Sequence, residues 1–191
     1  MKRKLILIGA STGGPGHIKK ILSSLGSDFK TPIIIAQHMN SIFISTFVLL
    51  FDDETGMRVF ETRDGMEIED GKVYICNKSI SLKKSGYSLK IEESNKESLY
   101  NPSIDLLFNS ALDVVDNVDI MAVLLTGIGD DGAKGLSNLQ KKGAICIAES
   151  EESAIVYGMP KKAVELNPQI KSKSLKSIID EIKKFDKNSE R

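Results

Sequence analysis

The sequence predicts an α/β domain with a doubly wound, mostly parallel sheet that is flanked by helices in a three-layer arrangement. Unbroken aliphatic runs occupy residues 4–8, 32–36 and 120–125, and such runs are typical of strands buried on both faces of a parallel sheet. Segments with helical periodicity lie between them, which indicates right-handed βαβ units. With 191 residues and 41% hydrophobic content, the chain suits a single domain over residues 1–191.

The first half of the chain begins with a strand at residues 4–8. A helix should follow, because apolar residues then recur at helical spacing and Gly26 ends the pattern. The run at 32–36 predicts the second strand. A second helix is expected from the apolar residues Phe43, Phe47, Val48, Leu50 and Phe51.

Residues 57–93 have a different character. The short alternating runs MRVFET, GKVYICN, SISLKKS and YSLKIEE are separated by glycine or asparagine. Short runs with such punctuation are typical of strands joined by hairpin-like turns. We therefore expect an antiparallel insertion or sheet edge in this segment.

The second half returns to the α/β pattern. Helical periodicity covers 103–115, and the aliphatic strand at 120–125 leads into a helix over 131–142. A strand is expected at 144–148. The last helix should span 174–186, with a frayed polar end over residues 184–191.

Composition narrows the classes of partner. The 26 lysines and arginines equal the 26 aspartates and glutamates, so no global positive field is available to hold nucleic acid or an anionic membrane. No apolar stretch is long enough to span a bilayer, and the N-terminus is too short in apolar residues for a secretory signal. We expect a cytoplasmic protein in which Cys76 and Cys146 are buried free thiols.

The segment Gly9-Ala10-Ser11-Thr12-Gly13 fits the nucleophile-elbow pattern G-x-S-x-G where a strand gives way to a helix. Ser11 would lie at the positive end of that helix, whose N–H groups stabilise an oxyanion. Two other interpretations are helix capping by Ser11 or Thr12 and a phosphate-binding turn. The segment lacks the G-x-G-x-x-G spacing and the Gly-Lys-Ser/Thr of a P-loop, which argues against nucleotide binding.

A serine nucleophile needs a base, and the chain has two histidines, His17 and His38. His38 directly follows the second strand, so it should share a sheet edge with Ser11. The alternative for His38 is an ordinary loop histidine beside a helix N-terminus. His17 lies inside the first predicted helix, where we expect a surface position.

The third member of a triad would be a carboxylate that orients the imidazole. Asp130 and Asp131 follow the strand at 120–125, and one of them can instead cap the next helix. Three strand ends thus bring serine, histidine and aspartate to one crevice, where open α/β sheets bind ligands. In α/β-hydrolases the histidine comes last, but no histidine follows His38, which excludes that fold.

Several segments together resemble the catalytic domain of CheB-type protein-glutamate methylesterases, in order and over nearly the whole chain. They are LILIGASTGG, IIAQHM, NPSIDLLFNSA, LLTGIGDDGAKGL and IAESEESAIVYGMP. The resemblance implies that Ser11 is the nucleophile, His38 the base and Asp131, rather than Asp130, the orienting acid. It also implies hydrolysis of glutamate methyl esters, and in many members deamidation of glutamines, on the cytoplasmic helices of chemoreceptors during adaptation.

The sequence departs from the family in four places. Members usually carry a receiver domain and a linker before the catalytic domain, whereas the first strand here begins within five residues of Met1. We expect a stand-alone catalytic domain without phosphorylation control in cis, with a fragment of a longer protein as the alternative. Residues 40–42 replace prolines and glycine, Asn101 replaces a basic residue, and Ile128 replaces a methionine. The first two of these substitutions should alter receptor docking.

The expected mechanism is attack of Ser11 on the ester carbonyl, with His38 as base, followed by hydrolysis of the acyl-enzyme. Backbone N–H groups of Thr12, Gly13 and Ile128 are candidates for the oxyanion site. No metal or organic cofactor is required, and the expected partner is a methylated chemoreceptor. The alternatives are a small-molecule carboxylesterase and a non-catalytic chemoreceptor-binding domain.

Overall fold

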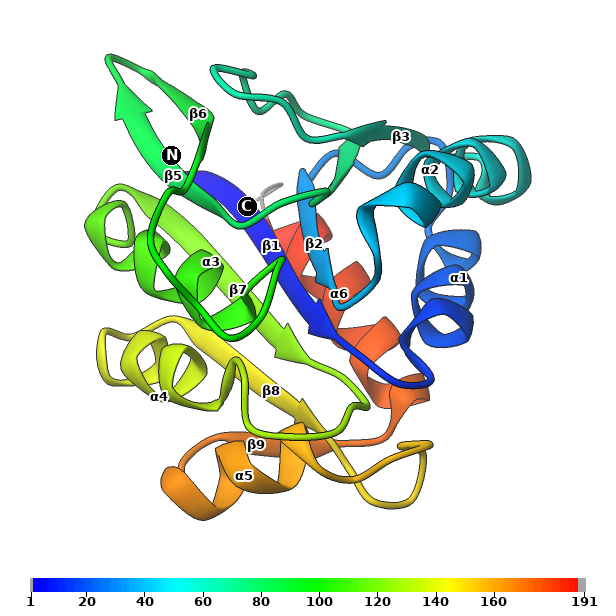
Figure 1. The fold of residues 1–191 in the computed structure, drawn as a ribbon, viewed down its shortest axis with the longest axis vertical. Coiled ribbons are helices and arrows are strands. Elements are labelled where there is room, and N and C mark those ends of the chain that lie inside the picture. Colours follow the sequence, from blue (N-terminus) through cyan, green and yellow to red (C-terminus); the bar gives the residue numbers. More distant parts are fainter. Residues whose placement is uncertain (1, 189–191) are drawn as a thin grey trace.

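The computed structural model describes residues 2–188, whose centre is a seven-stranded sheet in the order β3-β4-β2-β1-β7-β8-β9 (Figure 1). Every pairing within this sheet is parallel. Its strands are β1 (Arg3–Ala10), β2 (Ile33–Gln37), β3 (Arg58–Glu61), β4 (Lys72–Ile75), β7 (Val118–Leu124), β8 (Ile145–Glu149) and β9 (Lys171–Lys173). The predicted α/β class with a parallel sheet is confirmed.

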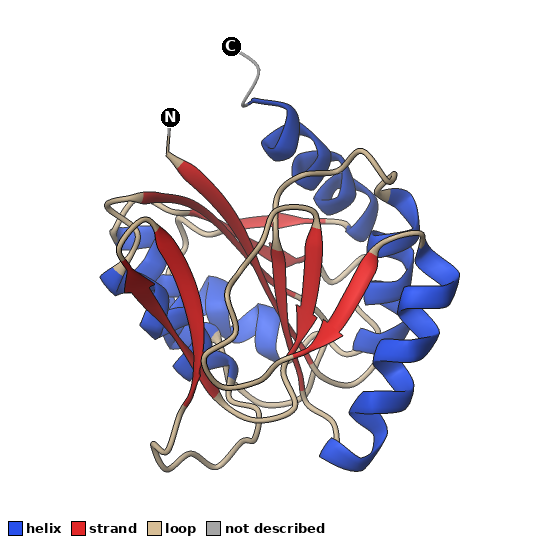
Figure 2. Ribbon diagram, turned by 90° about the horizontal axis from the view of Figure 1, so that it is seen from above, coloured by secondary structure: helices blue, strands red, loops and turns tan. Residues whose placement is uncertain are grey.

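Helices cover both faces of the sheet, so the domain has three layers (Figure 2). Helices α1, α2 and α6 pack on one face, and α3, α4, α5 and the β5–β6 hairpin pack on the other. The helices are α1 (Gly14–Ser24), α2 (Ser41–Thr55), α3 (Ile104–Ser110), α4 (Ala133–Lys141), α5 (Met159–Leu166) and α6 (Leu175–Lys187), with a 3₁₀ turn, η1, at Ala111–Asp113.

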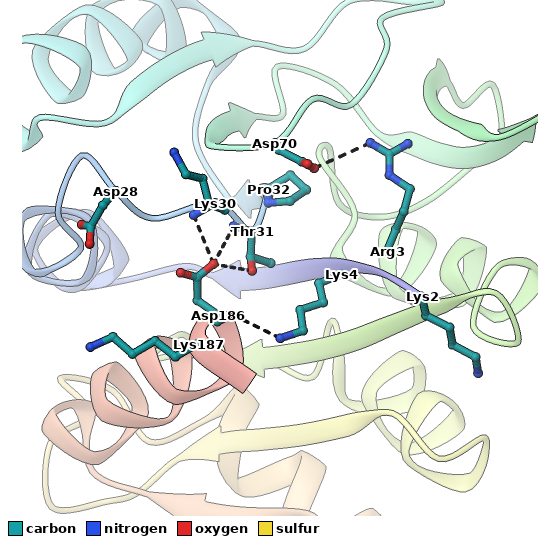
Figure 3. A pocket seen from close by; sticks show the side chains of 10 residues that line it. All are labelled: Lys2, Arg3, Lys4, Asp28, Lys30, Thr31, Pro32, Asp70, Asp186 and Lys187. Atoms are coloured by element: carbon teal, nitrogen blue, oxygen red, sulfur yellow. Dashed lines mark hydrogen bonds and ion pairs between the residues drawn. The ribbon is translucent and has the colours of Figure 1, made fainter. Parts of the chain in front are cut away.

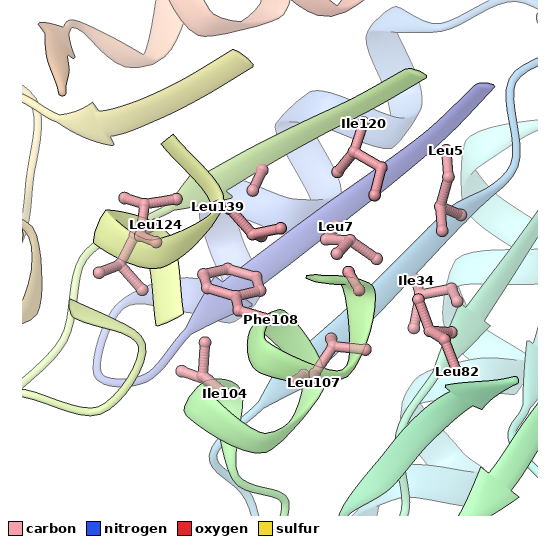
Figure 4. Close-up of a cluster of buried hydrophobic side chains, with 14 of the residues drawn as sticks. Leu5, Leu7, Ile34, Leu82, Ile104, Leu107, Phe108, Ile120, Leu124 and Leu139 are labelled. Atoms are coloured by element: carbon pink, nitrogen blue, oxygen red, sulfur yellow. The ribbon is translucent and has the colours of Figure 1, made fainter. Parts of the chain in front are cut away.

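Strand β1 shows why its aliphatic run is unbroken. Leu5 and Leu7 belong to the apolar cluster beneath α3 and α4, whereas Ile6 and Ile8 belong to the cluster beneath α1 and α6. All four side chains are fully buried. Figure 4 shows Leu7 facing Leu107 and Phe108 of α3, with Leu5 farther along β1 and nearer to Ile34. Burial of each such side chain stabilises the fold by about 1.5–3 kcal/mol.

The direction of the connections reverses at the centre of the sheet. From β1 the chain runs through α1 to β2 on one side, and from β7 it runs through α4 to β8 on the other side. Adjacent strands β1 and β7 therefore form a topological switch point, where the connecting loops part and leave a crevice at the carboxyl ends.

Residues 57–93 fulfil both expected alternatives, the sheet edge in the first half and the antiparallel insertion in the second. Strands β3 and β4 are parallel members of the main sheet with β3 at its edge, so the hairpin-like turn expected between them is wrong, whereas β5 (Ile80–Ser85) and β6 (Ser88–Glu93) form an antiparallel hairpin. The link between β3 and β4 crosses to β6, where Ile68 N–H donates to the Leu89 carbonyl at 2.9 Å. Because the link crosses to β6, the chain returns to the sheet with β4 parallel to β3. The short alternating runs of the sequence do not indicate such a crossing.

Other differences lie at element ends. The helix predicted over 103–115 is α3 followed by η1, and helix α5 and strand β9, both short, were not predicted. Fraying of residues 184–187 is wrong, because they belong to α6, Phe185 is buried, and the Asp186 carboxylate accepts the Thr31 N–H at 2.7 Å. The rest of that expectation falls partly on residues 189–191, outside the described part of the chain.

The structure also tests the expectations for the thiols and the membrane. Cys76 and Cys146 are both buried and free, as predicted. Within residues 2–188, no helix combines the length and the apolar character needed to cross a bilayer.

Candidate active site

Strands β1, β2 and β7 end at the same edge of the sheet; Ser11 and His38 directly follow β1 and β2, and Asp131 lies at the end of the loop between β7 and α4. The β1–β2 register pairs Ala10 with Gln37, so Ser11 and His38 are the next residues on two adjacent strands. The His38 N–H extends this ladder by donating to the Ala10 carbonyl at 2.9 Å. Neighbouring strands are about 4.8 Å apart, so the side chains of Ser11 and His38 lie within reach of each other.

Ser11 is fixed by the β7 side of the crevice. Its N–H donates to the Thr126 carbonyl at 3.0 Å. A Cβ atom at Gly127 would lie 2.6 Å from the Ser11 Cβ, so only glycine permits this close approach. Gly13, with a positive φ of 83°, is the N-cap of α1 and no side chain caps the helix. The capping interpretation of Ser11 and Thr12 is therefore wrong.

His38 and Asp131 form a hydrogen bond of 2.7 Å between Nε2 and Oδ2. Asp131 is only 3% exposed, whereas His38 is partly exposed, so the carboxylate end of this bond is shielded from water and the imidazole faces the crevice. An ionised carboxylate can only accept, which places the proton of a neutral imidazole on Nε2. Nδ1 of His38 then keeps its lone pair and is the ring atom left for the Ser11 hydroxyl.

Three further donors hold the Asp131 carboxylate. They are the N–H groups of Ile104 at 2.7 Å and Asp105 at 2.9 Å and the Ser103 hydroxyl at 3.3 Å, all at the start of α3. Burial by itself raises the pKa of Asp131, but the hydrogen bonds from His38, Asp105 and Ile104 outweigh burial and bring that pKa below its ordinary 3.8. Asp131 is therefore ionised at neutral pH.

The structure distinguishes Asp131 from its neighbour Asp130. Asp130 is exposed, whereas Asp131 is buried against His38. Gly132 occupies the N-cap position of α4, and no side chain caps that helix. Of the two aspartates, only Asp131 is in a position to orient the imidazole.

Ser11 and His38 are coupled through their main chains. Gln37 Nε2 donates both to the Ser11 carbonyl at 2.9 Å and to the His38 carbonyl at 3.0 Å. His38 is hydrogen-bonded to Asp131, but among residues 2–188 no hydrogen bond joins the Ser11 hydroxyl to the His38 imidazole. Such contacts are often long in unliganded enzymes and shorten when substrate binds.

Backbone donors surround Ser11. Among the described residues, no backbone carbonyl accepts a hydrogen bond from the N–H groups of Thr12, Gly13 or Ile128. The Ile128 side chain is 63% exposed, so it leaves the crevice rather than filling it. Unpaired N–H groups beside a nucleophile are suited to bind an oxyanion.

The surface position predicted for His17 is wrong. His17 is 5% exposed, and its Nδ1 lies 3.1 Å from Oε1 of Glu149, which is fully buried. His17 lies on the inner face of α1 with Gly14, Ile18 and Ile21, at the i, i+3, i+4 and i+7 spacing of a buried helix face. The periodicity that predicted the helix could therefore also have predicted the burial of His17.

The His17–Glu149 pair supports the turn after β7. Glu149 Oε2 accepts the Thr126 N–H at 2.9 Å, and Oε1 accepts the Ser153 hydroxyl at 2.8 Å. Because Thr126 also accepts the Ser11 N–H, the pair contributes to the placement of the serine. Glu149 was not predicted as a site residue; its position at the carboxyl end of β8 is the signal that could have indicated it.

Tyr100 is a second residue that was not predicted. Its ring stacks on the His38 imidazole with centroids 4.7 Å apart and ring planes 3° apart. It comes from the polar loop between β6 and α3, where nothing in the local sequence indicates which side chain reaches the crevice. Tyr100 directly precedes the NPSIDLLFNSA segment, and that position next to a segment that resembles the family was only an indirect indication that Tyr100 belongs to the site.

A cavity of about 730 Å³ lies at the opposite edge of the sheet, beside the start of β1 and the end of α6. Figure 3 shows Asp186 at its centre, bonded to Lys4 and to Lys30 and Thr31. None of the proposed triad residues lines it. Within residues 2–188, no three histidine, cysteine, aspartate or glutamate side chains cluster so as to hold a metal ion.

Comparison with known proteins identifies relatives. The family model of CheB methylesterase matches residues 6–182. A protein-glutamate methylesterase/protein-glutamine glutaminase 2 of Carboxydothermus hydrogenoformans is 41% identical over 169 residues, which cover 85% of this chain and 48% of that protein. A protein-glutamate methylesterase/protein-glutamine glutaminase of Bacillus subtilis is 38% identical over 85% of this chain and 47% of its own. The chain thus spans about half the length of these curated relatives.

A solved structure agrees with these matches. The crystal structure of the Thermotoga maritima CheB methylesterase catalytic domain superposes with a TM-score of 0.86 and 30% sequence identity. The match covers 95% of this chain and 98% of that one. By sequence and by fold, the chain belongs to the CheB methylesterase family.

Proposed function

We propose that this domain is a serine hydrolase that demethylates glutamate methyl esters on the cytoplasmic helices of methylated chemoreceptors, in chemotactic adaptation. The observation that carries the proposal is the 2.7 Å hydrogen bond between His38 and the ionised Asp131. His38 follows β2, which is the neighbour of the strand that Ser11 follows. The names of the curated relatives support both the methylesterase and a glutaminase activity. A cytoplasmic location follows from this substrate.

In the first half-reaction, His38 Nδ1 takes the Ser11 proton as Oγ attacks the ester carbonyl carbon. The tetrahedral oxyanion is stabilised by the N–H groups of Thr12, Gly13 and Ile128, each worth about 3 kcal/mol when aligned. Asp131 stabilises the imidazolium that forms. The C–O bond to the methoxy group then breaks, and His38 protonates the methoxy oxygen. Methanol departs, and an acyl-enzyme on Ser11 remains.

In the second half-reaction, water attacks the acyl-enzyme with His38 again as base, and the free glutamate carboxyl leaves Ser11. A receptor glutamine presents the same carbonyl with ammonia in place of methanol as the leaving group. One site therefore serves both demethylation and deamidation. Neither half-reaction requires a metal or an organic cofactor.

The test measures methanol release from methylated chemoreceptor by the wild type and by Ser11→Ala and His38→Ala variants. We expect both substitutions to abolish detectable turnover, because each removes a group that makes or breaks a bond. Ser23→Ala, an exposed serine on α1, is the matched control and should keep wild-type activity. Full activity in Ser11→Ala would reject the serine mechanism.

The same assay separates the alternatives. Comparable kcat/KM on a small soluble methyl ester would favour a small-molecule carboxylesterase. Receptor binding without methanol release by the wild type would favour a non-catalytic receptor-binding domain. Preference for the receptor ester supports the methylesterase.

A further inference from the structure

We propose that Tyr100 is a positioning residue that fixes the plane of the His38 imidazole so that Nδ1 points at Ser11; this inference rests on the proposed function. The stacked geometry carries it, with ring centroids 4.7 Å apart and an interplanar angle of 3°. No role in the reaction described above requires Tyr100 to touch the substrate.

The His38–Asp131 hydrogen bond alone does not define the orientation of the ring. One bond at Nε2 fixes a point and a direction, but the imidazole can still tilt about the line from Nε2 to Oδ2. Such a tilt moves Nδ1, the atom on the far side of the ring, away from Ser11. A flat ring stacked on the imidazole face opposes this tilt, because rotation would open the contact or force the two rings together.

The loop that carries Tyr100 is anchored directly after the tyrosine. Asn101 Oδ1 accepts the Ser79 N–H at 2.8 Å, and the Ser79 hydroxyl accepts the Ser103 N–H at 2.9 Å. The Tyr100 N–H itself donates to the Ser98 hydroxyl at 3.2 Å. The main chain that carries the stacked ring is therefore held to Ser79 through the residues that follow Tyr100.

Tyr100 also reaches the turn after β7. A Cβ atom at Gly129 would lie 2.8 Å from the Tyr100 hydroxyl oxygen, so the phenol passes directly beside that glycine. The ring thus lies between His38 and the turn that carries the Ile128 N–H. The Tyr100 side chain can therefore keep the His38 imidazole aligned with the proposed oxyanion donors.

The first test compares Tyr100→Phe, which keeps the ring, with Tyr100→Leu, which removes it. Misplacement of a catalytic group by about 1 Å can cost up to about 100-fold, so we expect kcat for methanol release to fall about 10-fold or more in Tyr100→Leu. KM should stay within about two-fold of the wild type, and Tyr100→Phe should keep wild-type kcat. Tyr87→Leu, at a fully exposed tyrosine, is the matched control.

The second test needs no turnover, and the chain offers an internal reference because it has only two histidines. NMR of the two imidazoles should show the His38 ring protons moving downfield in Tyr100→Leu, since the shielding by the stacked ring is lost. The His17 signals should stay unchanged, and Tyr100→Phe should keep the wild-type His38 shifts.

Two results would overturn the inference. One is wild-type kcat together with wild-type His38 shifts in Tyr100→Leu. The other is an equal displacement of the His17 and His38 signals, which would indicate a general disturbance of the fold. If the wild type releases no methanol, the proposed function fails, and the NMR comparison still tests whether Tyr100 stacks on His38.

Discussion

Replacing Glu149 by leucine should test how much the buried His17–Glu149 pair stabilises the domain. Glu149 is fully buried and accepts from three donors: the His17 ring, the Thr126 N–H and the Ser153 hydroxyl. Ser153 is partly exposed and can turn to water, but Thr126 and His17 are buried and cannot. The substitution therefore leaves two donors without acceptors.

Each buried donor that loses its acceptor costs about 1–3 kcal/mol, which gives about 2–6 kcal/mol for the two. We therefore expect Glu149→Leu to lower the free energy of unfolding by about 2–6 kcal/mol, against a total of about 5–15 kcal/mol for a typical domain.

Urea unfolding followed by circular dichroism measures this loss, and Glu151→Leu, at an exposed position nearby, should change the stability by less than about 0.5 kcal/mol. The double variant His17→Leu with Glu149→Leu should be less destabilised than the sum of the single changes, by about 1–3 kcal/mol. A loss below about 1 kcal/mol in Glu149→Leu, or strict additivity in the double variant, would refute this reasoning.

Three further predictions concern Asp131 and the thiols. Asp131→Asn should lower kcat for methanol release by about 10³- to 10⁴-fold, because the amide favours the wrong His38 tautomer; a loss below ten-fold would count against the orienting role. The folded-state pKa of Asp131 lies below its ordinary 3.8, so its carboxylate adds stability above that pH and loses it as pH falls through the folded value. The stability difference between wild type and Asp131→Asn in urea should therefore be largest at neutral pH and shrink near pH 2; the opposite trend would contradict the sign. Burial raises the pKa of Cys146 to about 12 and raises that of Cys76 as well, so neither thiol should react with a maleimide until urea unfolds the chain, and rapid labelling of the native protein would contradict their burial.

The central strands and the general position of the site could be predicted because one physical signal specifies each of them. Residues of β1 alternate between two cores, so the run must be apolar throughout, and a parallel strand delivers the residue after it to the carboxyl edge. Those two facts place Ser11, His38 and Asp131 at one edge without any coordinates. They could not decide between Asp130 and Asp131, which depends on which carboxylate meets the start of α3.

The errors arise where contacts between distant segments decide the structure. Strand β4 is parallel to β3 because the link between them pairs with β6, and that pairing joins residues far apart in the chain. The spacing of buried residues on α1 could have indicated that His17 is buried, but not that Glu149, at the end of β8, is its partner. Tyr100 reaches His38 because Asn101 and Ser103 are anchored at Ser79. Local periodicity contains none of these contacts.

The most direct test of the triad is covalent labelling of the native chain with a fluorophosphonate, which phosphonylates an activated serine. Peptide mass spectrometry should find the label on Ser11, and His38→Ala or Asp131→Asn should slow labelling by at least about 100-fold. Label on any other serine, or an undiminished rate in His38→Ala, would contradict activation of Ser11 by the His38–Asp131 pair.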